Sequence, residues 1–222
     1  MRVALYSEGP GEEGHARQFL PPPGDPLSDE SIGPAHMLVR RCIAEGTRIP
    51  APAVIFEVPL LLRGRVPRGS DLRVCKNLHK LLTWPRPAGV PDLAVVVLDA
   101  DGNLQIRREL AGCIGERPLP RPPVCLGVAV QEFEAWLHAD QRTLHTVVGQ
   151  VHDTLPDLES LPPREAKRIL QEWLSARYQD DPDARSAARK EIAARSDLEE
   201  IARRCRSFVD FRRDLLLAVP GS

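Results

Sequence analysis

The stretch DLAVVVLDADG, residues 92–102, constrains the fold of this chain more than any other part of it. Three consecutive valines at its centre favour an extended backbone. A long apolar run without polar alternation predicts a strand buried on both faces, as in the parallel sheets of α/β proteins. A second such run, VCLGVAV, starts at residue 124 and continues into QEFEAWLHAD, which predicts a strand that leads into a helix. Further strands are predicted over residues 3–7 and 53–62.

Helical patterns alternate with these strands and then replace them. Before residue 140 we expect helices over 33–46 and 70–82, and a short one near 12–19. After residue 140 we expect only helices, over 164–178, 183–196 and 198–219. The pattern predicts an α/β fold with a mainly parallel sheet flanked by helices. We divide the chain into an α/β core, 1–140, and a helical C-terminal region, 141–222, packed on that core.

Composition and missing motifs narrow the classes of function. The formal net charge is −1, so any surface for nucleic acid must be local. No apolar run reaches the roughly 18 residues of a membrane helix, and the N-terminus does not read as a secretion signal. HExxH, GxSxG, Walker A and GxGxxG motifs are absent, which argues against a catalytic zinc site, a hydrolase nucleophile elbow, a P-loop NTPase and a Rossmann dinucleotide site. Five widely spaced cysteines predict reduced thiols in a cytoplasmic protein: Cys42, Cys75, Cys113, Cys125 and Cys205.

Acidic residues follow three of the predicted strands. These are Glu8, Asp99 with Asp101, and Glu132 with Glu134. Ligands of α/β sheets bind at the carboxyl ends of the strands, so we expect these side chains to lie close together. Clustered carboxylates repel each other unless a positive charge compensates them, and Mg²⁺ prefers such oxygen ligands. The sequence therefore predicts a magnesium site.

Each acidic motif also has a structural interpretation. A glutamate at a strand end, such as Glu8, is often a solvated turn residue. DADG is typical of a tight turn, where Asp and Gly are favoured. EFEAW is typical of a helix N-terminus, where acidic side chains complement the macrodipole. The three motifs together, each after a core-like strand, favour the metal site.

Four segments resemble a Toprim-related family of bacterial proteins that was long catalogued as a domain of unknown function. The segments are LYSEGPGEEG, VVVLDADG, VQEFEAWLHAD and, near the C-terminus, CRSFVDF. The family is related to the nuclease domains of OLD-type enzymes and to RloB-like proteins. It resembles the nuclease effector subunit of PARIS-type anti-phage systems, and its members are often encoded beside an ABC/OLD-type ATPase.

The resemblance implies a Toprim-like core and a role for each acidic residue. Glu8 would be the general base or a metal ligand, and Asp99 and Asp101 would hold Mg²⁺, or Mn²⁺ in its place. Glu134 would be a further acidic ligand, with Glu132 beside it, whereas Trp136 would serve packing. Members often carry a lysine shortly after a tyrosine in the helical part. Here QDDPDAR follows Tyr178, which leaves Lys167 and Lys190 as candidates.

The helical C-terminal region is rich in arginine, with acidic residues nearby. One interpretation is solvated helix faces with ion pairs between residues four apart. The other is a local surface for phosphate groups, to which we assign Arg204, Arg206, Arg212 and Lys167.

Two functions of different classes follow. The first is a Mg²⁺-dependent Toprim-type nuclease, which hydrolyses phosphodiester bonds of DNA or RNA as a cytoplasmic effector of anti-phage defence. The second is a non-catalytic subunit that docks on an ABC/OLD-type ATPase. The expected partners are a nucleic acid, the ATPase and a second copy of the chain in a homodimer, but no membrane.

Overall fold

The fold is a parallel sheet with helices on both faces. A computed structural model describes residues 1–9, 22–84, 88–103, 105–115, 121–149, 155 and 157–221, so the helix expected near 12–19 lies outside the described residues. Within these ranges four parallel strands lie in the order β2–β1–β3–β4. Their bounds are Arg2–Ser7 (β1), Ile55–Glu57 (β2), Leu93–Asp99 (β3) and Val124–Ala129 (β4). The expected α/β fold, with a helical C-terminal part, is confirmed.

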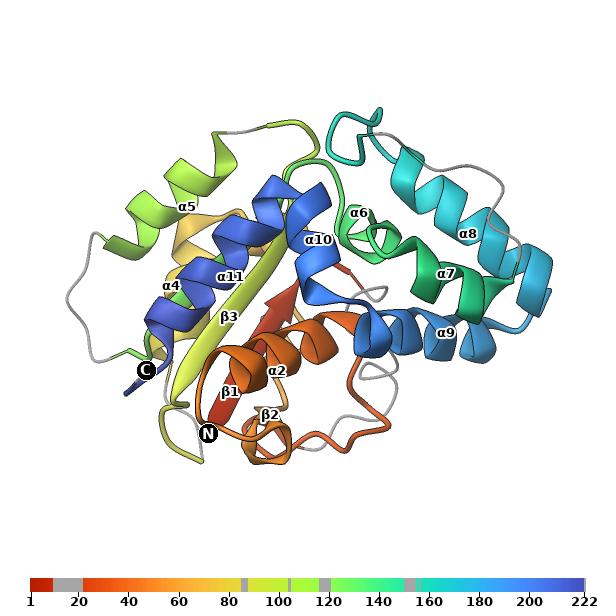
Figure 1. The fold of residues 1–222 in the computed structure, drawn as a ribbon. Coiled ribbons are helices and arrows are strands. Elements are labelled where there is room, and N and C mark those ends of the chain that lie inside the picture. Colours follow the sequence, from red (N-terminus) through yellow and green to blue (C-terminus); the bar gives the residue numbers. More distant parts are fainter. Residues whose placement is uncertain are drawn as a thin grey trace.

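The helices of the described residues connect and cover these strands (Figure 1). Their bounds are Pro34–Gly46 (α2), Ala51–Ala53 (a 3₁₀ turn, η2), Gly69–Leu72 (α3), Cys75–Thr83 (α4), Ile106–Gly115 (α5), Glu134–His138 (α6), Gln141–Val148 (α7), Glu165–Tyr178 (α8), Pro182–Arg195 (α9), Leu198–Arg204 (α10) and Arg206–Ala218 (α11).

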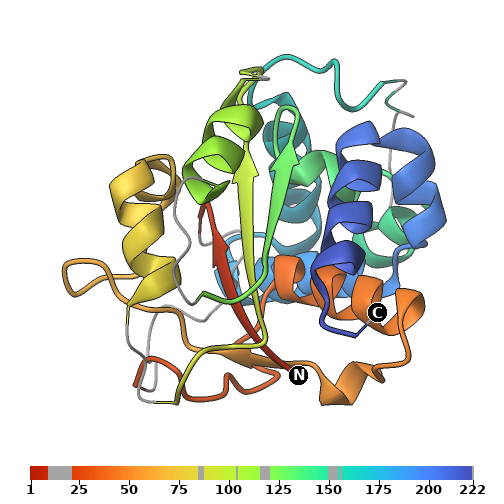
Figure 2. The same cartoon turned by 90° about the vertical axis from the view of Figure 1, so that its left-hand side faces the viewer.

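Side chains of the central strands alternate between two apolar cores. Leu5 and Val95 belong to the core shared with α2 and α6–α11, whereas Tyr6 and Val96 belong to the core shared with α4 and α5. Figure 2 shows the resulting layers, with α4 and α5 on one side of the sheet and α2 and α11 on the other. Every residue of β3 is buried, which confirms the burial on both faces expected from its valine run.

A glycine in β4 lets α11 lie directly on the sheet. A Cβ atom at Gly127 would come within 2.7 Å of Cδ2 of Phe211, so only glycine leaves room for this ring. Phe211 stacks on Trp136, and Phe208 contacts the same indole edge-on. The Trp136 Nε1–H donates to Oγ of Ser207 at 2.9 Å. Trp136 is fully buried, which confirms its assignment to packing.

Several element boundaries differ from the prediction. The strand expected over 53–62 ends at Glu57, two residues before Pro59, whose nitrogen cannot donate to a ladder. The helix expected over 70–82 is divided into α3 and α4, and that over 198–219 into α10 and α11, which meet at the extended Cys205. Helices α5 and α7 were not expected. The division at residue 140 stays a prediction; beyond it, α9 packs on α2 and α11 on β4.

Two cysteines are paired. Cys75 at the start of α4 and Cys113 in α5 form a disulfide with Cα atoms 5.5 Å apart, whereas Cys42, Cys125 and Cys205 are buried free thiols. The expectation of reduced thiols is therefore wrong for the first pair. The two cysteines are 38 residues apart, and only the packing of α4 beside α5 brings them together.

In the described part of the chain, no helix combines the length and the apolar character that a membrane crossing requires.

Two buried histidines stay neutral in the fold. Burial, together with the nearby charges of Arg40 and Lys190, lowers the pKa of His36 to about 3. The ring of His36 accepts a hydrogen bond from the Gly33 amide at Nδ1 and lies edge-on to Phe56. Burial also lowers the pKa of His138 to about 4, although its hydrogen bond to the Ala166 carbonyl opposes the shift.

We predict that reduction of the Cys75–Cys113 disulfide destabilises the protein. Chain entropy for a loop of this length gives about 4 kcal/mol, and measured disulfides commonly contribute about 2–4 kcal/mol. Denaturant unfolding with and without reductant should show a difference of this size. The Cys75→Ser/Cys113→Ser variant should show none. Five thiols that react with an alkylating agent in unreduced, denatured protein would contradict the pairing.

We predict that acid destabilises the protein through His36 and His138. Both folded-state pKa values lie below the unfolded value of about 6.5. As the pH falls below that value, the unfolded chain therefore binds protons that the folded chain does not bind. The contribution is complete above pH 6.5 and falls toward pH 4, by up to about 1.4 kcal/mol per pH unit for each histidine. Denaturant unfolding between pH 7 and pH 4.5 measures it. His36→Gln should flatten the pH dependence, whereas substitution of the exposed His145 should not.

Candidate functional site

The candidate site lies at the carboxyl edge of the sheet. Glu8 directly follows β1, Asp99 ends β3, and Glu132 and Glu134 follow β4. The strands are parallel and adjacent, so their ends meet at one edge, as the sequence predicted. The contacts divide the carboxylates into two groups, each around an arginine.

The first group surrounds Arg73. Nη2 of Arg73 lies 3.2 Å from both carboxylate oxygens of Glu8, 2.9 Å from Oδ2 of Asp101 and 2.8 Å from the carbonyl oxygen of Asp99. Four oxygens thus face one nitrogen atom. Burial alone would lower the pKa of the Arg73 guanidinium, but the hydrogen bond to Asp101 and the charge of Glu8 outweigh it and raise the pKa. Arg73 therefore remains a cation in this group.

Two local structures bring Arg73 and Asp101 together. Arg73 follows the last residue of α3 and precedes α4, so its side chain leaves the backbone where the expected single helix is interrupted. Asp101 lies in a turn closed by a hydrogen bond from the Asn103 amide to the Ala100 carbonyl. The backbone at Asp101 has a φ of 48° and that at Gly102 a φ of 77°, the left-handed region that Asp and Gly tolerate best. The tight-turn interpretation of DADG is thus correct, and the turn also presents the Asp101 carboxylate to Arg73.

Glu8 is fixed by backbone contacts. Its Oε2 accepts a hydrogen bond from the Asp99 amide at 2.9 Å, and its carbonyl accepts one from the Gly69 amide at 3.1 Å. A Cβ atom at Gly69 would overlap the Glu8 carboxylate, so this glycine leaves room for the side chain. The Asp99 carboxylate faces elsewhere: its Oδ1 accepts from the Phe133 amide at 2.7 Å. Asp99 thereby holds the segment between β4 and α6 against the end of β3.

The second group surrounds Glu134. This side chain is fully buried, and its Oε1 lies 3.0 Å from Nη1 of Arg189 and 3.9 Å from Nζ of Lys167. Arg189 also donates to Oε1 of Gln171 at 3.4 Å. Oε2 of Glu132 accepts a hydrogen bond from the Lys167 amide at 3.0 Å. Helices α8 and α9 thus supply the positive charges that this part of the sheet edge lacks.

The two groups influence each other electrostatically. Burial raises the pKa of Glu132, and the negative charges of Glu134 and Asp101 add to the increase, although the Lys167 amide and ammonium oppose it. Glu132 therefore lies within electrostatic reach of both groups. A divalent cation near it would favour the ionised form of this carboxyl.

The donor chemistry suits a metal ion, but arginine takes the place that the sequence assigned to one. Among the described residues, no three Asp, Glu, His or Cys side chains are grouped so that they could hold one ion. The oxygens of Glu8, Asp101 and the Asp99 carbonyl nevertheless surround a single cationic nitrogen. Carboxylate and carbonyl oxygens are the ligands that Mg²⁺ and Mn²⁺ accept. These oxygens therefore fit a metal in kind, once Arg73 moves away.

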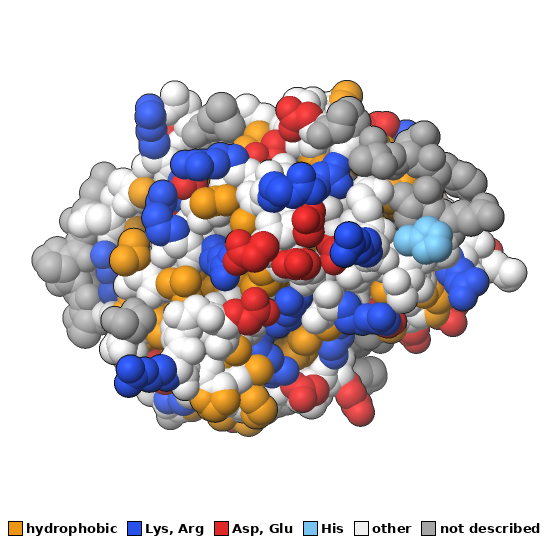
Figure 3. All heavy atoms as spheres, in the orientation of Figure 1, with side chains coloured by type: hydrophobic (Ala, Val, Ile, Leu, Met, Phe, Trp, Pro, Cys, Tyr) orange, Lys and Arg blue, Asp and Glu red, His pale blue; other side chains and the backbone are white. Residues whose placement is uncertain are grey.

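Of the basic residues assigned to nucleic acid, Lys167 contacts the acidic edge. Lys190, the other lysine candidate, instead donates to the Asp29 carbonyl. Arg212 pairs with Glu199 at 2.6 Å, and Arg206 is exposed at the start of α11. On the face that α10 and α11 cover, acidic and basic side chains lie intermixed (Figure 3). This arrangement favours the interpretation as solvated, ion-paired helix faces.

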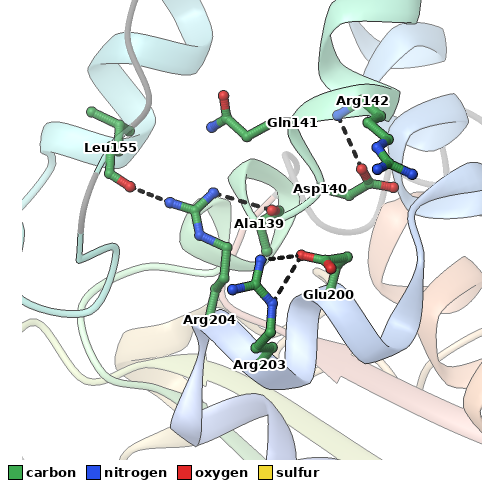
Figure 4. A pocket seen from close by; sticks show the side chains of 8 residues that line it. All are labelled: Ala139, Asp140, Gln141, Arg142, Leu155, Glu200, Arg203 and Arg204. Atoms are coloured by element: carbon green, nitrogen blue, oxygen red, sulfur yellow. Dashed lines mark hydrogen bonds and ion pairs between the residues drawn. The ribbon is translucent and has the colours of Figure 1, made fainter.

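Arg204 lies in a separate cavity of about 430 Å³ beside α10 and the start of α7 (Figure 4). Its guanidinium donates to the carbonyl oxygens of Ala139 and Leu155, and the neighbouring Arg203 donates to Glu200. The acidic side chains of the sheet edge do not line this cavity. Arg204 thus links α10 to the segments at Ala139 and Leu155, and Arg203 forms an ion pair within α10. The cavity is distinct from the candidate site.

Sequence reasoning missed Arg73 and Arg189. Nothing in SDLRVC indicates that the helix is interrupted at Arg73, since neither Gly nor Pro lies there. Arg189 gave a readable signal, because it stands three and four residues before Ile192 and Ala193, on the apolar face of the predicted helix that α9 buries. A buried arginine requires a carboxylate partner, although the pattern does not say which one.

We predict that Gly69→Ala displaces the Glu8 carboxylate and breaks its hydrogen bond to the Asp99 amide. A hydrogen bond to a charged group contributes about 1.5–3 kcal/mol, so exchange of the Asp99 amide hydrogen should accelerate roughly 10- to 100-fold. Hydrogen exchange followed by NMR measures this rate. Gly112→Ala is the matched control, because a Cβ atom there contacts nothing within 4 Å. An unchanged rate in Gly69→Ala would show that Glu8 is not held as described.

Comparison of the chain with protein-family models, with curated proteins and with solved structures found no match in any of the three. The likeness to the Toprim-related family therefore depends on the four sequence segments and stays a prediction.

Proposed function

We propose that this protein is a Mg²⁺- or Mn²⁺-dependent nuclease of the Toprim type, which hydrolyses phosphodiester bonds of DNA or RNA. The observation that carries the proposal is the convergence of four oxygens, from Glu8, Asp99 and Asp101, on one cationic point at the carboxyl edge of a parallel sheet. Lys167 on the same edge has a half-exposed side chain, and its positive charge suits a phosphate backbone.

The carboxylates have different roles in this proposal. A bound divalent ion would supply positive charge to the phosphate oxygens and to the leaving oxygen. Glu8 and Asp101 would hold it, together with the Asp99 carbonyl. Asp99 uses its carboxylate to position the Phe133 amide, and Glu134, with Glu132, orients Lys167 and Arg189.

Glu8 is suited to accept a proton. The Arg73 guanidinium contacts both of its carboxylate oxygens, and Oε2 is also held by the Asp99 amide, so Oε1 is the oxygen that becomes available when Arg73 turns away. In the hydrolysis, the oxygen of a water molecule forms a bond to phosphorus, and its proton passes to Oε1 of Glu8. The phosphorus–oxygen bond to the leaving sugar oxygen breaks, that oxygen takes a proton from solvent, and Glu8 then releases its proton to solvent.

A specific observation favours the second candidate, a non-catalytic subunit that docks on an ABC/OLD-type ATPase. Arg73 and Arg189 already neutralise Glu8, Asp101 and Glu134, as ion pairs in a purely structural site would. We place the nuclease first, because Arg73, Glu8 and Asp101 are only partly buried and remain accessible to solvent. In either case we propose a cytoplasmic anti-phage role, with the ATPase as partner and a homodimer as the assembly.

We predict metal-dependent cleavage by the wild type that Glu8→Gln and Asp101→Asn each reduce. Loss of several kcal/mol of transition-state stabilisation corresponds to about a 100-fold or greater fall in rate. Plasmid, single-stranded DNA, total RNA and tRNA are incubated with Mg²⁺, Mn²⁺ or EDTA, with and without the ATPase. Glu199→Gln is the matched control, since Glu199 pairs with Arg212 far along the chain from the strand ends.

Two results would contradict the nuclease. One is cleavage that persists in EDTA or in both substituted proteins, which would indicate a contaminating or different activity. The other is the absence of cleavage by a wild-type chain that still binds the ATPase, which would favour the docking subunit.

A further inference from the structure

Arg73 lies among the carboxylates of the sheet edge, but not all of its hydrogen-bond donors have a partner. A single nitrogen, Nη2, makes its contacts to Glu8, Asp99 and Asp101, whereas its Nε is buried without a hydrogen-bond partner. A guanidinium that binds carboxylates well uses two parallel N–H groups. Arg73 does not form the usual two parallel hydrogen bonds to one carboxylate. Its contacts instead resemble those of a single cation surrounded by oxygen atoms.

A second observation at the same edge points to a ligand. Among the described residues, five buried side-chain atoms lack a hydrogen-bond partner, and three of them belong to Arg73, Gln131 and Glu134. Glu134 is 0% exposed, and the atom concerned is Oε2, the oxygen that Arg189 does not contact. The main-chain carbonyl of Gln131 accepts from the Asp101 amide at 3.2 Å, and its unpartnered side-chain oxygen, Oε1, lies beside Gly102 of the same turn, 3.6 Å from where a Cβ atom would be. Buried polar groups left unsatisfied in this way require an explanation such as an ion or a ligand.

We propose that Arg73 is the resting occupant of the cation site, and that a divalent ion displaces it onto a phosphate of the substrate. The inference rests on the proposed nuclease function and assigns Arg73 to phosphate binding.

Binding of a divalent ion to these oxygens requires such an exchange. A guanidinium and a divalent ion repel each other and cannot share the same oxygens of Glu8 and Asp101. The side chain of Arg73 is 33% exposed, and those of Glu8 and Asp101 are 27% and 49% exposed, so solvent reaches all three. Arg73 can therefore turn outward by side-chain rotation. Outside the carboxylates, the group that a guanidinium recognises best is a phosphate, through its paired N–H donors.

The first test measures Mn²⁺ binding without nucleic acid, from the EPR signal of the free ion. Arg73→Ala should bind Mn²⁺ about tenfold or more tightly than the wild type, because the competing cation is gone. Arg73→Lys keeps the charge and should fall between the two. The matched control is Arg65→Ala, which removes a cation from the same part of the chain, where Arg65 pairs with Asp71 at 2.9 Å. Arg65→Ala should bind Mn²⁺ like the wild type.

A measurement on the unsubstituted protein covers the case in which Arg73→Ala folds poorly. The Nε–H NMR signal of Arg73 should shift when the wild type is saturated with Mg²⁺. A Mg²⁺-bound protein in which this signal does not move overturns the inference.

The remaining outcomes separate the inference from the proposed function. Equal or weaker Mn²⁺ binding by Arg73→Ala overturns the inference, while metal binding by the wild type leaves the nuclease proposal standing. An equal gain in Arg65→Ala indicates a general charge effect and also overturns the inference. Absence of Mn²⁺ binding in every variant overturns both proposals.

The second test measures phosphate binding. Short single-stranded DNA and RNA oligonucleotides, labelled for fluorescence anisotropy, are titrated in Ca²⁺, which is used to hold the site without cleavage. Arg73→Ala should bind both at least about fivefold more weakly than the wild type, while Arg65→Ala should not. Equal affinity of Arg73→Ala and the wild type, or no binding by the wild type, overturns the phosphate step.

Discussion

The gathering of carboxylates at one edge of the sheet determines where this protein places its buried and half-buried positive charges. Parallel strands end together, so Glu8, Asp99 and Asp101 meet with Glu132 and Glu134 whether or not a ligand is present. Like charges held so close need positive partners. The fold supplies them from two directions: Arg73 from the helices on one face of the sheet, and Arg189 with Lys167 from α8 and α9 on the other.

The most specific motif of the chain, EFEAWLHAD, serves mainly to build this edge. Trp136 anchors α6 to α11 through Phe211, and His138 holds the start of α8 through the Ala166 carbonyl. The Asp140 carboxylate caps α7 and also accepts a hydrogen bond from the Asp197 amide at 2.9 Å, before α10. The motif therefore fixes the helices that carry Lys167 and Arg189. Its two glutamates, Glu132 and Glu134, are the residues that contact these two basic residues.

Much of the fold could be predicted from the sequence, whereas the site could be predicted only in part. The valine run of β3 indicated a strand buried on both faces, and the acidic residues after three strands indicated one shared edge. The partners of those acids come from helix packing that no local pattern records. Arg73 reaches Glu8 because the helix is interrupted there, and Cys75 meets Cys113 because α4 lies beside α5. Each depends on tertiary contacts between segments far apart in the chain.

The disulfide of Cys75 has a consequence for the speed of events at the sheet edge. Cys75 lies two residues after Arg73 and is tied to α5, while the Arg73 amide donates to the Gly69 carbonyl at 3.0 Å. The backbone on both sides of Arg73 is therefore anchored, and only its side chain has room to move. Side-chain rotation is faster by orders of magnitude than the hinge motions that open many enzymes. With the disulfide formed, the change of occupant that we propose needs only rotation of the Arg73 side chain, with no helix displaced.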